Sequence, residues 1–584
     1  MITHDVEWKP YHNDDKGLQT RSIRIYLMTS TQSDRVISFD PCTVVRPICY
    51  LCLLDAVAPS PVALALLYPK MPNLPPEDGK SDQMLEEADD VQHLTPVESL
   101  NRSSFPTDFV FGAGSSSYQF EGAANEGGRK PSIWDVFTHK FSTDKISDGS
   151  NGDVATDFYH RYKEDLTLMK DMGSDAFRFS LSWSRIIPSG KLSEGVNQIG
   201  IDFYNNLINE MIAKGLQPFA TIFHWDLPQA LEKEYGGFLS PKIVEDFADF
   251  AELCFKKFGD RVKHWMTLNE PSTYSDLGYD SGVNAPGRCS QWYAEYCHTG
   301  NSATEPYIVS HHLILAHGVA VKIYREKYQE SQNGEIGVSH SVDWYVPYSD
   351  TEVDRKAAER ELDFVFGWFM EPMTYGKYPS IMRQLVGARL PNFTKEQSEM
   401  LKGSYDFVGV NYYTAYYAVS VKYPNKENVS YETDDLVDLV VEKDGKLIGP
   451  QAASSWLHVY PKGIHSVLIY AKEKYNNPKM YITENGYDEF NNVSLPISEA
   501  LKDPLRIDYH YKHLIYVLKA IKDGVNVKGY FAWGATDNFQ WSSGYTMRFG
   551  FVFIDFSNGL KRYPKDSYYW FKQCWNIYVA SVSS

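Results

Sequence analysis

From Phe105 onward, short apolar runs alternate along the chain with longer amphipathic segments. The short runs are rich in β-branched and aromatic residues, which favours strands, and the longer segments repeat apolar residues at helical spacing. Strands that alternate with helices form parallel sheets covered by helices. The pattern therefore predicts an α/β fold, a (β/α)8 TIM barrel with long active-site loops. The eight predicted strands are residues 108–114, 176–183, 218–225, 264–270, 335–344, 405–413, 479–484 and 527–533.

The helical pattern is clear in "SPKIVEDFADFAELCFKKFG", residues 240–259. Ser240 is expected to be the N-cap of this helix, because a serine side chain can accept a hydrogen bond from the first turn. Pro241, the next residue, suits the first helical position.

The first hundred residues do not follow this alternation. Residues 44–68 are apolar, but Asp55 and several prolines interrupt them, whereas a membrane span needs about 20 uninterrupted apolar residues. The run also begins too far along the chain for a standard signal peptide. Residues 75–90 are acidic and have no apolar face, which is typical of a disordered linker. We therefore expect a non-catalytic and largely disordered extension, one barrel domain and a short tail, at residues 1–104, 105–577 and 578–584.

Composition and charge narrow the function. The chain of 584 residues has a formal net charge of −18, which argues against nucleic acid or an anionic membrane as the main partner. Its seven cysteines are too few for a disulfide scaffold, and no set of cysteines and histidines has the spacing of a zinc site. We therefore expect no metal and no cofactor.

Polar and aromatic side chains stand at the C-terminal ends of the predicted strands. In a (β/α)8 barrel this edge carries the active site. Each residue alone could equally cap a helix or begin a loop, but their recurrence on strand after strand favours one common site. The residues are Arg178, His224, Asn269, Glu270, Asn411, Tyr413, Glu484 and Trp533.

Two of these residues are carboxylates at the same level of the barrel. Glu270 lies in "TLNEP", where Pro271 fixes the exit of the strand, and Glu484 ends the apolar run "MYITE" ahead of a turn. Without a metal motif, two carboxyls that face one cleft suggest glycoside hydrolysis: one protonates the leaving oxygen, and the other attacks or activates water. Such a pair needs one protonated and one charged member. Arg178 and Tyr413 are expected to lie beside Glu484 and to hold it charged.

Together, "TLNEP" and "ITENG" resemble the signature pair of glycoside hydrolase family 1, the retaining β-glucosidases. Further peptides similar to that family follow in order: "SSYQFEGA", "RFSLSWSRI", "FHWDLPQAL", "GGFLS", "VGVNYYT" and "RFGFVFIDF". The resemblance implies that Glu270 is the acid/base and Glu484 the nucleophile, about 5 Å apart, with net retention of configuration. It also implies that Arg178 and Tyr413 orient the nucleophile. The residues it assigns to the sugar are Gln119, His224, Asn269, Asn411, Tyr413 and Trp533.

The loop "WGATDNFQW" after the last strand departs from the family pattern. The family usually has a serine where this chain has Gly534 and a glutamate where it has Gln540, beside Trp541. By resemblance, position 540 holds the outer hydroxyls of the sugar. An amide still donates and accepts hydrogen bonds there, but without the stronger charge-assisted ones. Glucose remains the expected sugar, and a catalytically impaired glycoside-binding homologue is the alternative to a working enzyme.

Other stretches resemble the plant members of the family. In those proteins the cysteines that match Cys289 and Cys297 form a disulfide, and the alternative is two free thiols. Trp456, in "SSWLHVYPKG", matches a tryptophan placed against the aglycone, where a flat apolar group gains from stacking. The alternative for Trp456 is a place in the core.

Within the plant members, "KISDGSNGD" and "GSYDFVGVNYYTA" look most like the branch that cleaves monoterpenoid indole alkaloid glucosides, of the strictosidine and raucaffricine type. The expected function is hydrolysis of the O-glucosidic bond of such glucosides by double displacement. Neighbouring branches act on secoiridoid, cyanogenic or other plant glucosides. Thioglucosides are disfavoured, because those relatives have glutamine where this chain has Glu270. The expected partner is thus a small-molecule glucoside, and a homo-oligomer is left open.

The compartment is poorly determined by the sequence. Sequons for N-glycosylation begin at Asn101, Asn392, Asn428 and Asn492, but no clean signal peptide accompanies them. The chain ends in "NIYVASVSS", without the basic cluster that sends some relatives to the nucleus. We expect a cytoplasmic protein, with the vacuole or the endoplasmic reticulum as the alternative.

Overall fold

The structure is a computed structural model that describes residues 100–576; most of the predicted extension and the whole predicted tail lie outside the described residues. The barrel strands are β1 (Val110–Gly114), β2 (Ala176–Ser180), β3 (Gln217–Phe223), β4 (His264–Asn269), β5 (Glu335–Ser341), β7 (Phe407–Asn411), β12 (Met480–Glu484) and β14 (Val527–Ala532). They are all parallel and close into a barrel in the order β1-β14-β12-β7-β5-β4-β3-β2. The predicted (β/α)8 barrel is confirmed, and each of the eight predicted strands is present.

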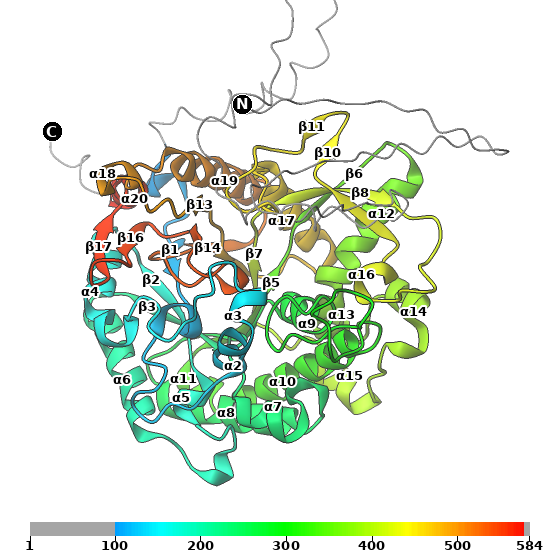
Figure 1. Cartoon of the computed structure of the whole chain (residues 1–584), viewed down its shortest axis with the longest axis horizontal. Helices are drawn as coiled ribbons and strands as arrows, with labels where there is room; N and C mark the ends of the chain where they lie inside the picture. Colours follow the sequence, from blue (N-terminus) through cyan, green and yellow to red (C-terminus); the bar gives the residue numbers. More distant parts are fainter. Residues whose placement is uncertain (1–99, 577–584) are drawn as a thin grey trace, which may run out of the picture. The chain divides into compact units, whose positions relative to one another are not determined.

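Helices surround the barrel (Figure 1). The longer ones are α4 (Phe158–Asp171), α6 (Gln198–Ala213), α8 (Ile243–Phe258), α10 (Glu305–Lys327), α12 (Glu352–Leu362), α17 (Pro461–Lys474), α19 (Pro504–Lys522) and α20 (Asp566–Asn576). The shorter ones are α2 (Ile133–Lys140), α3 (Ser142–Lys145), α5 (Trp183–Ile186), α7 (Gln229–Tyr235), α9 (Pro271–Tyr279), α11 (Gln329–Gln332), α13 (Trp368–Tyr375), α14 (Ser380–Val386), α15 (Lys395–Leu401), α16 (Tyr431–Asp434) and α18 (Ile497–Ala500). On α8, for example, Phe247, Phe250 and Cys254 are buried at helical spacing, which covers the barrel with an apolar face.

Small sheets in the loops lie outside the barrel. A three-stranded sheet is made of β6 (Trp344–Pro347), β8 (Ala415–Ser420) and β9 (Val437–Val440), and α12 packs against it. The pairs are β10 (Glu442–Lys443) with β11 (Lys446–Leu447), β13 (Glu489–Phe490) with β15 (Met547–Arg548), and β16 (Val552–Asp555) with β17 (Lys561–Pro564).

Several predicted boundaries are wrong. The second strand ends at Ser180 and not at residue 183, because Trp183 already begins α5. The fifth strand ends at Ser341 and not at residue 344, because Trp344 already belongs to β6 of the outer sheet. Ser240 is not the N-cap of α8, which begins at Ile243 after Lys242. Ser240 is instead the C-cap of a short 3₁₀ turn, Gly237–Leu239.

The barrel interior is filled by side chains, mostly from the first half of the strands. Six of them form a separate apolar cluster: Ala176, Phe219, Met266, Phe407, Tyr481 and Phe531. The rings of Phe219 and Phe531 have centroids 4.6 Å apart. Because this cluster occupies the interior, the polar strand ends beyond it are the place left for a site.

The described chain begins a few residues before the predicted domain boundary at Phe105. Leu100 is buried, and Arg102 donates to the Asp175 carboxylate at 2.8 Å and to the carbonyl of Trp575 at 2.7 Å. Arg102 therefore contacts both an early and a late segment of the barrel domain, before β2 and on α20.

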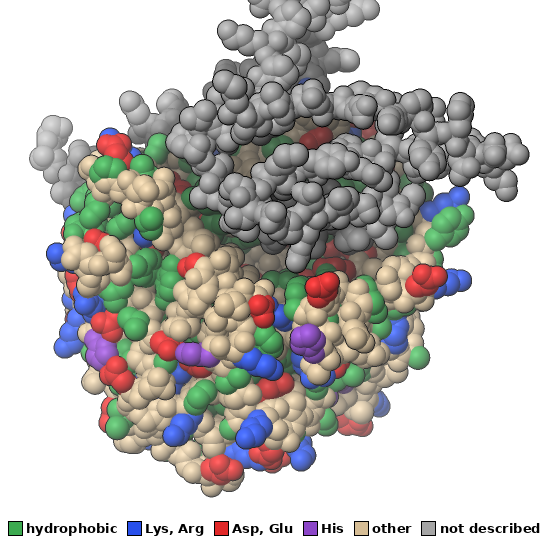
Figure 2. Space-filling model, in the orientation of Figure 1, with side chains coloured by type: hydrophobic (Ala, Val, Ile, Leu, Met, Phe, Trp, Pro, Cys, Tyr) green, Lys and Arg blue, Asp and Glu red, His purple; other side chains and the backbone are tan. Residues whose placement is uncertain are grey.

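On the face drawn in Figure 2, acidic and basic side chains are interspersed. Between residues 100 and 576, every helix is too short or too polar to span a bilayer.

Candidate active site

The strand that carries Glu484 is out of regular register at its end. Along β12 and β7, Ile482 pairs with Val410, but Glu484 pairs with the next residue, Asn411, so that Thr483 is an extra residue. Side chains alternate in a regular strand, and an extra residue reverses the alternation beyond it. As a result, both Thr483 and Glu484 reach side chains of the site. This explains why an apolar strand presents a glutamate at its tip.

The strand that carries Glu270 has a similar irregularity. Between β4 and β5, Met266 pairs with Gly337 and Asn269 pairs with Ser339, so that β4 has one residue more over this interval. Met266 belongs to the cluster inside the barrel, and Asn269 again reaches the site three residues later. Glu270 follows with a positive φ of 42°, a conformation that is uncommon outside glycine.

Two donors hold the Glu484 carboxylate. The Nη1 of Arg178 on β2 donates to Oε1 of Glu484, and the hydroxyl of Tyr413 donates to Oε2 at 2.8 Å. Arg178 has 0% of its surface exposed, and Glu484 is its anionic partner. The predicted neighbourhood of Glu484 is therefore present in the structure, with each oxygen fixed by one donor.

Glu270 is in a different electrostatic setting. The Nδ2 of Asn411 donates to Oε1 of Glu270 at 2.7 Å, and no cation is paired with Glu270 among the described residues. Burial, and then the charge of Glu484, raise the pKa of Glu270 to about 8. At neutral pH Glu270 is therefore mostly protonated, which suits a general acid.

Asn269 connects these groups. Its Oδ1 accepts from Nη2 of Arg178 at 2.5 Å and from Nδ2 of Asn411 at 3.2 Å. Its Nδ2 donates to Nε2 of His224 at 3.1 Å. Burial, and then Arg178, lower the pKa of His224 well below its usual value, so that this imidazole is neutral and can accept. The two carboxyls thus belong to one hydrogen-bonded network.

Two of the predicted sugar-binding residues, Gln119 and Gln540, lie in the segments that follow β1 and β14. The Nε2 of Gln119 donates to the carbonyl of Phe539 at 2.9 Å and lies 3.5 Å from Oε1 of Gln540. The Nε2 of Gln540 donates to Oδ1 of Asn538 at 2.9 Å. Gln540 is therefore not isolated but joined to Gln119 and Asn538, and it is buried.

Aromatic rings border this network. The rings of Trp533 and Trp541 are both roughly parallel to His224, with centroids 6.1 and 5.9 Å away. Trp456 lies beside Tyr413, with the two rings edge-on and their centroids 5.8 Å apart. Its exposed fraction of 42% contradicts the alternative that Trp456 is a core residue.

Sequence reasoning missed two contributors. Asn538 accepts from both Gln119 and Gln540, and the indole of Trp225 donates to the carbonyl of Asn269 at 2.9 Å. Both residues lie inside motifs that the sequence analysis quoted. The motifs indicated the region, but a residue's hydrogen-bond partner depends on the fold.

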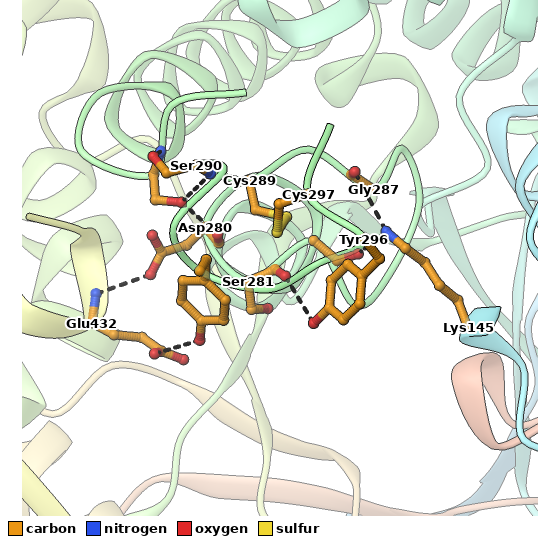
Figure 3. The surroundings of a disulfide bond; sticks show 12 residues. Lys145, Asp280, Ser281, Gly287, Cys289, Ser290, Tyr296, Cys297 and Glu432 are labelled. Atoms are coloured by element: carbon orange, nitrogen blue, oxygen red, sulfur yellow. Dashed lines mark hydrogen bonds between the residues drawn. A yellow bond between two sulfur atoms is a disulfide. The ribbon is translucent and has the colours of Figure 1, made fainter. Parts of the chain in front are cut away.

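The Cys289–Cys297 disulfide is present, so the expectation taken from the plant resemblance is confirmed and the alternative of free thiols is wrong. Figure 3 shows the loop around the disulfide, with Lys145, Asp280 and Glu432 beside it. This loop follows α9, the helix that starts directly after Glu270. Lys145 donates to the carbonyl of Gly282 at 2.7 Å and anchors the same loop from another segment. The disulfide therefore braces the chain that leads away from the active site.

A group of three carboxylates beside this loop was not anticipated. Asp276, Asp280 and Glu432 have oxygens within 4.8 Å of one another. Asp280 accepts the backbone N–H of Glu432 at 3.0 Å, and Glu432 accepts the hydroxyl of Tyr293 at 2.6 Å. Burial, and then Glu432, raise the pKa of Asp276 and Asp280 well above the usual value, which favours shared protons between these groups.

Comparison with known proteins agrees with this geometry. Residues 101–577 match the family model for glycosyl hydrolase family 1. Beta-glucosidase 12 of Oryza sativa subsp. indica is 58% identical over 474 residues, which cover 81% of this chain and 93% of that protein. Raucaffricine-O-beta-D-glucosidase of Rauvolfia serpentina is 54% identical and covers 81% of this chain and 91% of its own. A rice β-glucosidase mutant in a covalent complex with Glc superposes with a TM-score of 0.80 at 51% identity, covering 82% of this chain and 99% of that one.

We expect the Cys289→Ser/Cys297→Ser double variant to be less stable by about 2–3 kcal/mol, because the lost cross-link closes a short loop and restricts the unfolded chain. The measurement is the melting temperature of the wild type and the variant without reductant. Cys574→Ser, which removes a free thiol, is the matched control. An unchanged melting temperature in the double variant would contradict a stabilising role.

Proposed function

We propose a substrate class and a division of roles for this chain, which belongs to glycosyl hydrolase family 1 and is a retaining β-glucosidase. The substrate class is the O-glucosides of plant specialised metabolites, with monoterpenoid indole alkaloid glucosides of the strictosidine or raucaffricine type as the first choice. Secoiridoid and cyanogenic glucosides are the alternative.

The observation that carries this proposal is the exposed Trp456 next to Tyr413. Tyr413 donates directly to Glu484, and the Trp456 ring stands edge-on to it. A leaving group attached to a sugar at Glu484 would meet this ring. An exposed tryptophan favours a large apolar aglycone, because such a group gains from stacking and from leaving water.

A relative named for raucaffricine supports the alkaloid choice, at 54% identity. Numbered β-glucosidases of rice and Arabidopsis reach 57–58% identity, and their names give no substrate. The exposed ring of Trp456 indicates the property of the aglycone that an experiment should vary, namely its apolar surface.

In the proposed mechanism, an oxygen of Glu484 attacks the anomeric carbon while Glu270 gives its proton to the departing aglycone oxygen. This step forms a glucosyl ester at Glu484 and releases the alcohol. Glu270, now a carboxylate, then takes a proton from water, which displaces Glu484 from the anomeric carbon. Two displacements on opposite faces leave the sugar with its original configuration.

The charge on Glu484 helps Glu270 to change roles. Before the first step, this charge contributes to the raised pKa of Glu270 and keeps the proton on it. When Glu484 becomes a neutral ester, that contribution disappears and the pKa of Glu270 falls. The same residue is therefore an acid in the first step and a base in the second.

We expect Glu484→Gln to abolish hydrolysis, because no nucleophile remains. Glu270→Ala should keep activity on dinitrophenyl glucoside, whose leaving group needs no proton, and added azide should restore turnover in place of activated water. The measurement is release of the phenol with activated and unactivated glucosides. If Glu270→Ala were equally inactive on both in azide, the acid/base assignment would be wrong.

We also expect kcat/KM of the wild type to fall as the pH rises above about 8, because Glu270 must be protonated to act as the acid and its pKa is about 8. In Glu270→Gln the side chain does not titrate. This decline should therefore be absent from the residual activity on dinitrophenyl glucoside. A decline at the same pH in Glu270→Gln would show that another group is responsible.

Trp456→Ala should reduce kcat/KM for alkaloid or terpenoid glucosides by about 10-fold or more, since the lost stacking and burial contribute roughly 1–3 kcal/mol. A small alkyl glucoside should be nearly unaffected. The measurement is a panel of plant glucosides with both proteins, and Trp456→Phe is the matched variant that keeps a ring. Equal losses on large and small aglycones would argue against contact with the aglycone.

Gln540→Glu should raise kcat/KM for a β-glucoside by about 5- to 30-fold, because hydrogen bonds to a charged group are stronger than neutral ones. The preference over the 4-epimer and the 6-deoxy sugar should become sharper. The comparison needs the same aglycone on each sugar, so that only the sugar pocket varies. An unchanged or lower efficiency for glucoside would indicate that this pocket, with Asn538 bound to Gln540, suits another or a modified sugar.

A further inference from the structure

We propose that Thr483, the residue before Glu484, is a positioning residue for hydrolysis: its hydroxyl fixes the orientation of the Asn411 amide and, through it, the acid/base carboxyl of Glu270. The proposal rests on the hydrolysis of β-glucosides and on the role proposed for Glu270, and it does not depend on the natural aglycone.

The contacts form a short relay. The Oγ1 of Thr483 donates to Oδ1 of Asn411 at 2.7 Å. The other end of the same amide, Nδ2, donates to Oε1 of Glu270 at 2.7 Å and to Oδ1 of Asn269 at 3.2 Å. Thr483 and Asn411 are fully buried, so that water does not replace either partner freely.

The orientation of the amide matters, because its two ends have nearly the same shape and opposite hydrogen-bonding roles. A reversed Asn411 would place its oxygen against Glu270 and against Oδ1 of Asn269. The Asn269 oxygen is itself fixed, since Arg178 beside it can only donate. Thr483 supplies the donor at the opposite end, and Asn269 and Thr483 together select one orientation.

The strand next to Thr483 leaves room for this side chain. Gly409 on β7 has no Cβ, and a Cβ built there would lie 2.7 Å from Oγ of Ser339 on β5 and 2.8 Å and 2.9 Å from Oγ1 and Cγ2 of Thr483. Contacts below 3 Å would force both side chains to move. The missing side chain at Gly409 and the extra residue in β12 therefore both contribute to the placement of one hydroxyl.

The relay has a measurable electrostatic effect. A donor on the Glu270 carboxylate stabilises the charged form, so Asn411, followed by Thr273 and Arg178, lowers a pKa that burial and Glu484 raise. If Asn411 loses its orientation, this stabilisation is lost and the pKa of Glu270 rises. The decline of kcat/KM at alkaline pH should then move to higher pH. A residue with a merely structural role would not move it.

The test compares Thr483→Val, which keeps the branched shape and removes the hydroxyl, with Thr483→Ser, which keeps the hydroxyl. The measurement is the pH profile of kcat/KM on nitrophenyl β-glucoside, with melting temperatures alongside. We expect Thr483→Val to move the alkaline decline up by about 0.5–1 pH unit and to lower kcat/KM at neutral pH by roughly 3- to 30-fold. Thr483→Ser should keep the decline at the wild-type pH.

Gly409→Ala provides a second variant, which retains the hydroxyl but displaces it, and it should shift the profile in the same direction. Gly409→Ala also tests the positioning role of Thr483 if Thr483→Val does not fold. A wild-type alkaline decline in Thr483→Val or in a folded Gly409→Ala would overturn the proposal, whatever the change in melting temperature. Glu270→Gln separates this failure from an error in the proposed function: if the alkaline decline persists without Glu270, then the acid/base assignment is wrong and not the role of Thr483.

Discussion

A fully buried arginine sets the arrangement of the active site. A guanidinium without a partner in the protein interior costs several kcal/mol, so that Arg178 requires an anion and further acceptors within reach. Glu484 supplies the anion and Asn269 supplies an acceptor. Because Arg178 can only donate, the Asn269 amide must turn its oxygen toward Arg178 and its nitrogen toward His224. One buried charge thus determines the orientation of the Glu484 carboxylate, an amide and a neutral imidazole.

The same arginine explains why the two carboxyls differ. It is paired with Glu484, whereas Glu270 has an amide donor, a buried setting and a negative charge nearby. Burial and like charge both favour the neutral acid at Glu270, and its pKa of about 8 follows. Double displacement requires opposite protonation states of the two carboxyls. These states arise because Arg178 is paired with Glu484 and not with Glu270.

The fold and the outline of the site could be predicted from the sequence, because they depend on local periodicity and on motifs. The eight strands are apolar runs, which are buried whatever their pairing register with the neighbouring strands. The glutamates are marked by "TLNEP" and "ITENG". The irregular pairing at Thr483 could not be predicted, because it depends on the neighbouring strand that contains Gly409. Ser240 was wrongly predicted as an N-cap, because it ends the 3₁₀ turn before it and α8 begins only at Ile243.

The positions of the residues also explain where the site can vary. Arg178 and Glu484 stand on strands inside a closed barrel, where a shift of one side chain would disturb several hydrogen bonds. Gln540 and Trp456 stand on loops outside the barrel strands. Gln540 donates to Oδ1 of Asn538, a bond that a carboxylate at this position could not make. A substitution at Gln540 or Trp456 therefore leaves the hydrogen bonds between Arg178, Glu484 and Asn269 in place.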